Sequence, residues 1–215
     1  AASDVYKRQV LDAVVDFLPS PVDIESIEGS SVDDPETKVN IKNSTEGAFT
    51  ALAFKIATDP FVGKLTYIRV YSGTLKKGSF CIDSNTGDKQ RISRILQMHA
   101  NKREELEEVK AGEIVAVIGL KNVRTGHTLS EKGDVTLESM EFPDPVVAVS
   151  IEPVSKSDQD QLAKGMNKLS EEDPTFKVKV DSETGQTVIS GMGEVHLEII
   201  IDRLKREFNL SLIHI

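Results

Sequence analysis

Residues 54–79 read FKIATDPFVGKLTYIRVYSGTLKKGS, and this stretch decides the fold of the first half of the chain. Short runs of β-branched and aromatic residues alternate here with glycine-containing turns, as in strands joined by tight reversals. The same texture runs from residue 48 to residue 141. Six glycines fall in it where reversals or positive φ angles are needed: Gly73, Gly78, Gly87, Gly112, Gly119 and Gly126. Several short strands at this spacing predict a closed β-barrel over residues 48–141.

The pattern changes after two prolines, Pro143 and Pro145. An alternating strand, PVVAVSIEP, is followed by a helical segment, by the strands FKVKVD and TVISG, and by a second helical segment. The order β-α-β-β-α predicts a ferredoxin-like domain over residues 142–210 that lacks its last strand. Without that strand, the first strand would have an open edge from Val146 to Ile151.

The second helix of this domain, predicted over residues 193–208, has apolar residues on two sides. Val195 and Ile199 project roughly opposite the inner stripe at ~100° per residue. The inner stripe itself would consist of Leu197, Ile201, Leu204 and Phe208. Because a helix that is apolar on two sides usually has two packing partners, we expect one to be its own sheet and the other a neighbouring domain.

The first 47 residues differ from both predicted domains. Residues 10–21 carry a short helical stripe that Pro19 and Pro21 stop, and we expect its apolar side to face a domain that is absent from this chain. Residues 22–47 are acidic and lack sustained periodicity, so they predict a linker with one short strand near residues 39–41.

The cysteine content and the hydropathy indicate a reducing compartment. The chain has one cysteine, Cys81, which lies in an apolar run and is predicted to be a buried thiol. No apolar run approaches the ~20 residues that cross a bilayer, and the N-terminus has no basic segment followed by an apolar one. These features favour a cytoplasmic protein.

The charge distribution singles out the predicted barrel. Residues 1–44 contain four basic and nine acidic residues. Residues 45–141 contain fourteen basic and thirteen acidic ones, and residues 142–215 contain eight and thirteen. Only the middle part escapes the acidic excess behind the net charge of −9. Its basic residues cluster over a short stretch: Lys89, Arg91, Arg94, His99, Lys102 and Arg103. A local basic stripe on an acidic protein favours a docking contact with phosphate.

The sequence shows no catalytic constellation. A phosphate-binding GxxxxGK[ST] loop is absent, and the four histidines are dispersed without metal-ligand spacing. The paired carboxylates in EELEE and SEEDP lie in charged segments that are typical of solvated surface. We therefore expect no catalytic residue, no bound cofactor and no metal in this chain.

Several blocks together resemble elongation factor G, a bacterial-type translational GTPase. They are LDAVVDFLPSP from residue 11, FKIATDPFVGKLTYIRVYSGTLKKGS from 54, RILQMHANKREE from 94, LESMEFPDPVVAVSIEP from 137, LSEEDPTFKV from 169 and ETGQTVISGMGEVHLEIIIDRLKREF from 183. The resemblance runs from about residue 10 to 210. It implies the C-terminal helix of a GTP domain at residues 10–21, a translation-type barrel (domain II) at 48–141 and a truncated ferredoxin-like domain III at 142–210.

The resemblance also implies a function. Elongation factor G promotes GTP-dependent translocation of tRNA and mRNA on the ribosome, with GTP and Mg in a GTPase domain that this chain lacks. The barrel would dock on small-subunit rRNA through the basic stripe, and the third domain would touch a small-subunit ribosomal protein. The chain is then expected to be a monomeric fragment that is inactive as a GTPase by itself.

Three residues match the pocket for the inhibitor fusidic acid, which binds family members between the GTP domain and the third domain: Thr175, His196 and Arg203. Residues 1–9 and 211–215 match nothing in the family and are expected to be a non-native leader and tail. The alternatives are the equivalent domains of a ribosomal-protection or release-type GTPase, or a free-standing RNA-binding barrel. An acylphosphatase-type enzyme would share the βαββα pattern, but EPVSKSDQ lacks its arginine-bearing anion loop.

Overall fold

The computed structural model describes residues 2–59, 61–100, 102–137, 140–182 and 184–214. The chain divides into two compact units. The first comprises residues 1–53, 67–121 and 127–138, and the second comprises residues 54–66, 122–126 and 139–215. Each unit contains its own cluster of buried apolar side chains.

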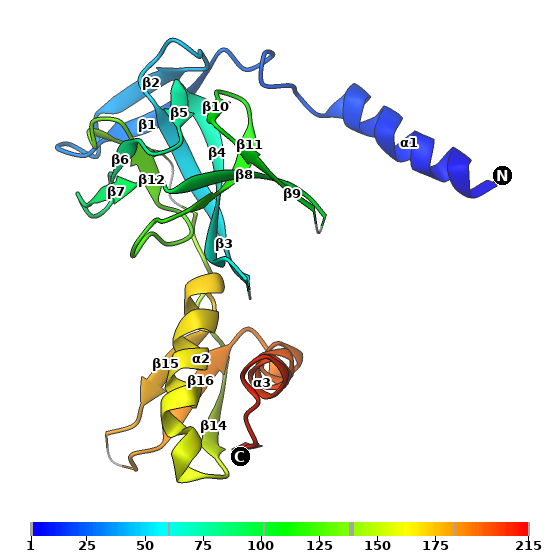
Figure 1. Ribbon diagram of the computed structural model, residues 1–215, viewed down its shortest axis with the longest axis vertical. Helices are drawn as coiled ribbons and strands as arrows, with labels where there is room; N and C mark the ends of the chain where they lie inside the picture. Colours follow the sequence, from blue (N-terminus) through cyan, green and yellow to red (C-terminus); the bar gives the residue numbers. More distant parts are fainter. Residues whose placement is uncertain (1, 60, 101, 138–139, 183, 215) are drawn as a thin grey trace. The chain divides into compact units, whose positions relative to one another are not determined.

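The strands predicted for residues 48–141 form the barrel. Over the described residues, eight strands make one sheet in the order β7-β6-β12-β3-β4-β11-β8-β9 (Figure 1). They are β3 (Thr50–Asp59), β4 (Gly63–Ser72), β6 (Phe80–Asp83), β7 (Lys89–Arg91), β8 (Arg94–His99), β9 (Lys102–Leu106), β11 (Ile114–Ile118) and β12 (Thr128–Ser130). A short ribbon, β5 (Thr74–Lys76) with β10 (Glu108–Lys110), accompanies them.

The sheet closes through one bent segment, residues 89–99. Its first part, β7, pairs with β6, and its second part, β8, pairs with β11. Between them, the Ser93 amide donates to the Ile118 carbonyl at 2.9 Å. Because one segment pairs with strands from the two sides of the sheet, it removes most of the exposed edge that an open sheet would present.

The barrel interior is aliphatic. The side chains of Ile68, Val70, Ile92, Ile95, Val117 and Leu129 are all buried. All six glycines that the sequence places at reversals have positive φ. Gly73 shows why the residue is needed, since an added Cβ would lie 2.6 Å from the Phe49 Cα and the φ angle is +74°.

One carboxylate is buried in the barrel. Asp83 is fully buried, and its Oδ2 lies 2.7 Å from Nδ1 of His127. A carboxylate only accepts hydrogen bonds, so Nδ1–H of His127 donates. The backbone N–H of Asn85 donates to Oδ1 of Asp83 at 3.0 Å. Burial, and then the charge of Asp83, raises the pKa of the nearby Cys81 thiol to about 12. The prediction of a buried cysteine is confirmed.

Residues 22–47 are not the plain linker that the sequence predicts. They contain a β-hairpin of β1 (Ser26–Ser31) and β2 (Lys38–Lys42), which pairs with β13 (Val135–Leu137) in a three-stranded sheet. Ile41 is buried against Val135 and Leu137. The strand expected near residues 39–41 is present, but β1 was missed. One of its two partners, β2, is close in sequence, but the other, β13, lies about a hundred residues away and leaves no local signal.

The first helix, α1 (Ala2–Phe17), is longer than the stripe over residues 10–18. Its apolar residues are exposed, with Leu11 at 65% and Val15 at 80%. No described residue buries this stripe. None of the helices among the described residues is long and apolar enough to span a membrane.

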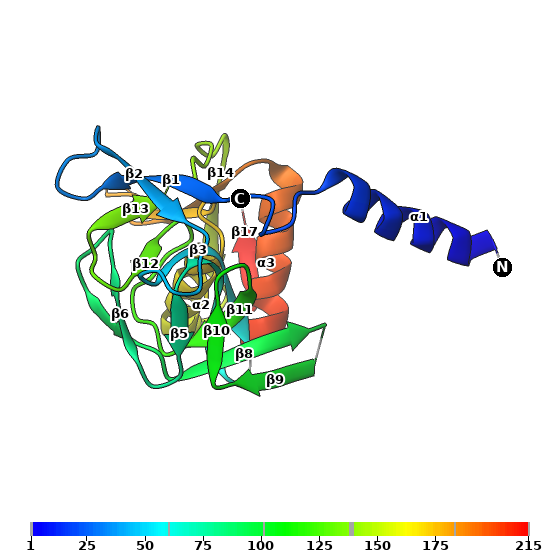
Figure 2. The ribbon, with the colours of Figure 1, turned by 90° about the horizontal axis from the view of Figure 1, so that it is seen from above.

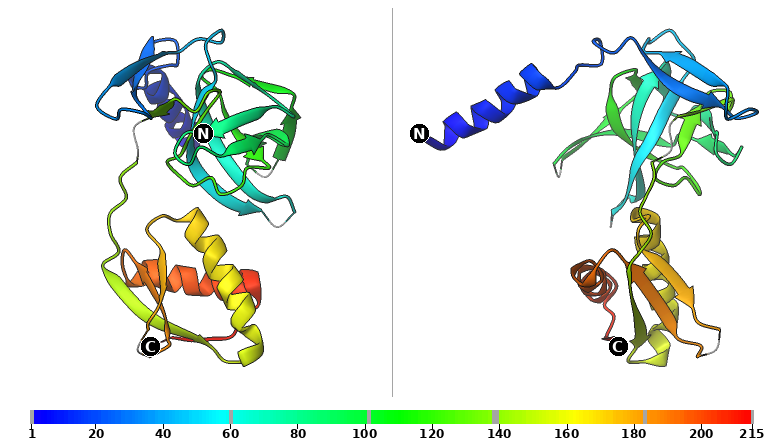
Figure 3. Two further views of the ribbon diagram at one scale, coloured as in Figure 1. Left: turned by 90° about the vertical axis from the view of Figure 1, so that its left-hand side faces the viewer. Right: turned by 180° about the vertical axis from the view of Figure 1, so that it is seen from behind.

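The second unit has the predicted βαββα order. Its elements are β14 (Val147–Pro153), a 3-10 turn (Lys156–Asp158), α2 (Gln159–Glu172), β15 (Lys177–Val180), β16 (Thr187–Gly191), α3 (Glu194–Phe208) and β17 (Leu212–His214). The sheet order is β15-β16-β14-β17, with antiparallel pairing throughout. Both helices share a core with the sheet (Figure 3). They meet closely at Gly165, where an added Cβ would lie 2.8 Å from Leu204.

A last strand is present in this domain, although the sequence predicted none. In β17, residues 212–214 pair antiparallel with Pro153, Glu152 and Ile151. The open edge predicted for Val146 to Ile151 is therefore wrong at Ile151. Over residues 147–150, the described strands pair with β14 only on the β16 side. Three residues suffice for this short strand because Leu212 is also buried in the core.

Helix α3 has the two-sided character that its sequence predicts. Leu197, Ile201 and Leu204 are buried, together with Ile200, which the predicted stripe omitted. On the other side, Val195 is 68% exposed and Ile199 is 53% exposed. The helix therefore covers its own sheet with one side and leaves an apolar strip uncovered by any described residue.

The core of the second unit gives a direct stability test. Phe176 is buried to 1% exposure, so Phe176→Ala should destabilise this unit by about 3–5 kcal/mol through lost burial and a cavity. The exposed Val195 provides the control, because Val195→Ala should change stability by less than about 0.5 kcal/mol. Urea denaturation followed by circular dichroism measures both. Equal effects of the two substitutions would contradict the assigned core.

Candidate functional site

The predicted basic stripe lies on β7 and β8, which form the bent closing segment, and on β9, the strand after it. Figure 1 labels β7, and Figure 2 shows β8 and β9 side by side. In antiparallel pairs, directly opposite residues share a face. Lys102 lies opposite His99, whereas Arg103 lies opposite Met98. Arg94 shares the Met98 face by alternation. The six residues therefore do not make one patch, since the β8–β9 hairpin presents its cations on two faces.

The six residues also differ in their partners. Nε of Arg94 lies 3.3 Å from a carboxylate oxygen of Glu105, and the Lys89 ammonium lies 4.5 Å from the centre of the Phe80 ring. Arg91 and Lys102 are exposed and form no ion pair within the described part of the chain. These two cations can bind phosphate without first breaking an internal contact.

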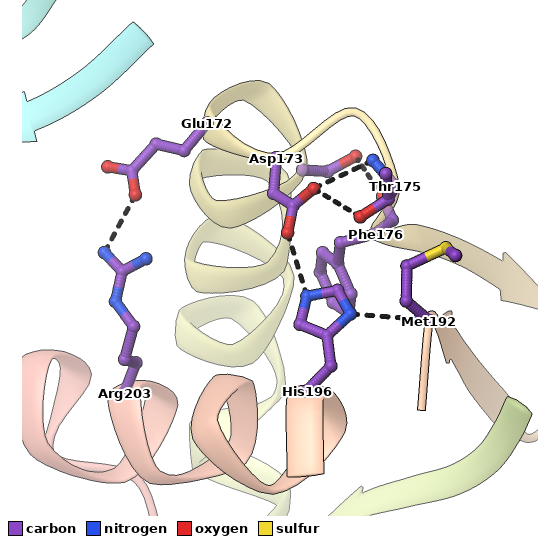
Figure 4. Close-up of polar contacts among 8 residues, drawn as sticks. Glu172, Asp173, Thr175, Phe176, Met192, His196 and Arg203 are labelled. Carbon is purple, nitrogen blue, oxygen red and sulfur yellow. Dashed lines mark hydrogen bonds and ion pairs between the residues drawn. The ribbon is translucent and has the colours of Figure 1, made fainter. Parts of the chain in front are cut away.

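In the second unit, the carboxylate of Asp173 gathers two of the predicted pocket residues (Figure 4). Its Oδ1 accepts a bond from the Thr175 amide at 2.8 Å and another from the Thr175 hydroxyl at 2.6 Å. Its Oδ2 lies 2.8 Å from Nε2 of His196. Asp173 ends α2 and His196 lies in the first turns of α3, so this carboxylate ties the two helices together.

The hydrogen bonds fix the tautomer of His196. The Met192 amide donates to Nδ1 at 3.0 Å, so Nδ1 carries no proton. Nε2 then carries the proton and donates it to Asp173. Both ring nitrogens therefore have a hydrogen-bond partner within the second unit.

Arg203 binds the neighbouring carboxylate. Its Nη2 lies 2.8 Å from Oε2 of Glu172 (Figure 4). Its Nε lies 2.7 Å from Oε1 of Glu207, one helical turn further on. The hydrogen bonds that Arg203 donates, chiefly to Glu207 and also to Glu172, raise the pKa of its guanidinium above the ordinary value. The three pocket residues thus reach two adjacent carboxylates rather than one another.

The pKa of Asp173 is lowered by this arrangement. Burial of the carboxyl is the largest single effect and raises the pKa. The hydrogen bonds from Thr175 and His196 lower it, and together they outweigh burial, so the pKa lies below its ordinary value. The ionised form is therefore the one that the fold favours.

Glu172 and Asp173 are the residues that the sequence reading missed. SEEDP was predicted to be solvated surface, which is wrong for Glu172, whose side chain is 11% exposed, and incomplete for Asp173 at 32%. The run Asp-Pro-Thr does carry a signal, because an aspartate accepting bonds from the residue two positions later is a recurrent turn. Its bond to His196 depends on the tertiary fold and has no local signature.

The chemistry available here is that of a closed polar cluster. The described residues contain no group of three or more His, Cys, Asp or Glu side chains that could hold a metal ion. In this cluster, each carboxylate is matched by donors from its own unit. Such a cluster holds its side chains in defined orientations.

The stability of the second unit should depend on pH through Asp173. Because its pKa is lower in the folded state, its contribution is complete above the ordinary value of about 3.9 and is lost as the pH falls through the lower folded value. Asp173→Asn should therefore reduce stability at pH 7 and flatten the acid limb of the stability profile. Glu198→Gln, on the exposed surface of α3, serves as the control. Urea midpoints between about pH 2.5 and 7 decide, and an unchanged acid limb in Asp173→Asn would contradict the assignment.

Two glycines before α3 allow a matched test of the His196 position. A Cβ at Gly191 would lie 2.7 Å from Nδ1 of His196, so Gly191→Ala should displace the ring and cost about 1–3 kcal/mol. A Cβ at Gly193 meets nothing within 4 Å, and its backbone is extended, so Gly193→Ala should cost less than about 1 kcal/mol. The ¹⁵N shifts of the His196 ring should change only in the first variant. Similar shifts in both would show that Gly191 does not define the ring's place.

Comparisons with known proteins match the two domains separately. Residues 63–130 match the family model for elongation factor Tu domain 2, and residues 142–214 match that for elongation factor G, domain III. A crystal structure of a protein from Thermus thermophilus is similar over 96% of this chain, with a TM-score of 0.72 and 26% sequence identity. The chain spans 28% of the length of that protein. It therefore carries a β-rich translation domain 2 followed by an α+β elongation factor G domain III, the domains II and III of translational GTPases.

Proposed function

We propose that this chain is the ribosome-docking and domain-coupling part of an elongation factor G, which promotes GTP-dependent translocation of tRNA and mRNA. The observation that carries the proposal is the succession, in one chain, of a match to translation domain 2 and a match to elongation factor G domain III. The 28% share of the related Thermus protein supports a larger parent. In that parent, GTP and Mg would belong to a separate GTPase domain, and the compartment would be the cytoplasm.

Docking on small-subunit rRNA is assigned to the barrel. Of the three sections of the sequence compared above, only residues 45–141, which contain the barrel, have no acidic excess. Arg91 and Lys102 in this section are exposed and form no ion pair among the described residues. Lys89, Arg94, His99 and Arg103 flank them on the same three strands. A few cations of this kind favour a steered contact with an RNA surface rather than tight wrapping of free RNA, which requires many phosphate contacts.

Coupling is assigned to the second unit. Asp173 holds Thr175 and His196 in fixed orientations, and Glu172 holds Arg203. A surface that couples the movement of two domains requires side chains fixed in this way. We propose that this surface faces the GTPase domain and contributes to a fusidic acid pocket. The exposed apolar side of α3 and the uncovered stripe of α1 would then be covered in the parent, and a small-subunit ribosomal protein would contact the same domain.

A chimera tests translocation directly. Residues 22–214, which include the β1–β2 hairpin and β17, replace the equivalent segment of a bacterial elongation factor G, and single-round mRNA translocation is measured against factor concentration. The chimera should translocate, and Arg91→Ala with Lys102→Ala should raise the concentration for half-maximal rate and lower its salt dependence by about one unit of slope per cation. Lys164→Ala with Lys205→Ala removes equal charge from the helices and should have little effect.

The outcomes separate the rival assignments. A chimera that binds ribosomes and hydrolyses GTP but does not translocate would indicate domains of a ribosomal-protection or release-type factor. Equal effects of the two double substitutions would remove the docking role of the basic stripe. Failure of the folded chimera to bind ribosomes at all would contradict the proposal as a whole.

A further inference from the structure

One exposed phenylalanine lies beside the basic stripe. Phe80 begins β6 and is 54% exposed. Alternation along β6 places Cys81 and Asp83 inside, where both are buried, and Phe80 on the outer face with Ile82. The ring is therefore a surface feature of the barrel and does not belong to its core.

Two cations border this ring. The Lys89 ammonium lies 4.5 Å from the ring centre, and Arg91 is the residue directly opposite Phe80 in the β6–β7 pair. Opposite residues in an antiparallel pair lie close enough for their side chains to touch. The Arg91 guanidinium forms no ion pair within the described residues. The turn 84–88 connects the two strands, so the three side chains share one short hairpin.

An unstacked RNA base fits this arrangement. Single-stranded and loop bases are recognised by stacking on aromatic rings, while neighbouring arginine and lysine side chains bind the phosphates. Lys89 over the ring shows that its π face attracts a positive group, and the same ammonium can move to a phosphate when a base arrives. The chain as a whole is acidic, so this local positive charge complements RNA better than the protein's general surface does.

We propose that Phe80, Lys89 and Arg91 form a site for one unpaired RNA base and its flanking phosphates, within the rRNA contact of the barrel. The assignment rests on the proposed docking function and adds to it the chemical class of the contact, a base extruded from a loop or bulge. It predicts preference for RNA with unpaired bases over duplex RNA of equal charge.

The absence of tryptophan from the chain permits a clean test. Phe80→Trp keeps an aromatic ring and introduces a single indole into the full 215-residue chain. Its fluorescence is titrated with a single-stranded adenine octanucleotide, with an abasic octamer of the same charge, and with the duplex of the octanucleotide. Phe61→Trp, at another exposed phenylalanine, reports nonspecific quenching. We expect the octanucleotide to quench the Phe80→Trp variant, the abasic strand and the duplex to leave it unquenched, and the Phe61→Trp variant to remain unchanged throughout.

A second variant measures the contribution of the ring. Phe80→Leu keeps an apolar side chain without a π face and should bind the labelled octanucleotide roughly tenfold more weakly by anisotropy, with binding of the abasic strand unchanged. Equal quenching by the abasic strand, equal quenching in both tryptophan variants, or unchanged affinity of Phe80→Leu would overturn the base site.

Sedimentation with purified small ribosomal subunits distinguishes the base site from the docking function. If the wild-type chain sediments with the subunits but the octanucleotide does not quench the Phe80→Trp variant, the base site is wrong and the docking function stands. If the chain neither sediments with the subunits nor binds the octanucleotide, both are wrong. A photoreactive group at residue 80 gives a further test. If it crosslinks to a ribosomal protein and not to rRNA, the base site is also wrong.

Discussion

The second unit depends on the pairing of a carboxylate at the end of one helix with an imidazole at the start of the next. Asp173 receives both donors of Thr175 and the Nε2–H of His196, and His196 in turn receives the Met192 amide. A partly buried carboxylate without these donors would carry the full cost of desolvation. With them, the end of α2, the turn into β15 and the start of α3 are held by one set of bonds. Glu172, one residue earlier, holds Arg203 in the same way.

The polar groups of this cluster contact one another within the second unit. Asp173 accepts from Thr175 and His196, and His196 accepts from the Met192 amide. Exposed groups without such partners among the described residues include the cations Arg91 and Lys102 and the apolar strip of Val195 and Ile199. Both are surface features that suit binding. The proposed role in docking and coupling follows from this division between internally paired and unpaired groups.

The sequence predicted the parts of the fold whose signal is local. Glycines with positive φ mark the reversals of the barrel, and the apolar spacing of α3 identifies Leu197, Ile201 and Leu204 as its inner side. It failed where a contact joins distant segments. Strand β1 pairs with the nearby β2 but also with the distant β13, and β17 pairs with residues 151–153. In the candidate site, the resemblance to elongation factor G identified Thr175, His196 and Arg203. Only the tertiary fold shows that Glu172 and Asp173 hold them.

The central claim is that the barrel, through its basic stripe, meets small-subunit rRNA. Because Cys81 is buried and its pKa is raised to about 12, a cysteine introduced at an exposed position can be labelled selectively. Tethering an iron chelate at Lys102→Cys, or at Lys164→Cys on α2, and mapping hydroxyl-radical cleavage of ribosomal RNA measures which surface lies against it. The account predicts localised cleavage of small-subunit rRNA from position 102 and much weaker cleavage there from position 164. No cleavage from position 102, or the same cleavage from both positions, would contradict it.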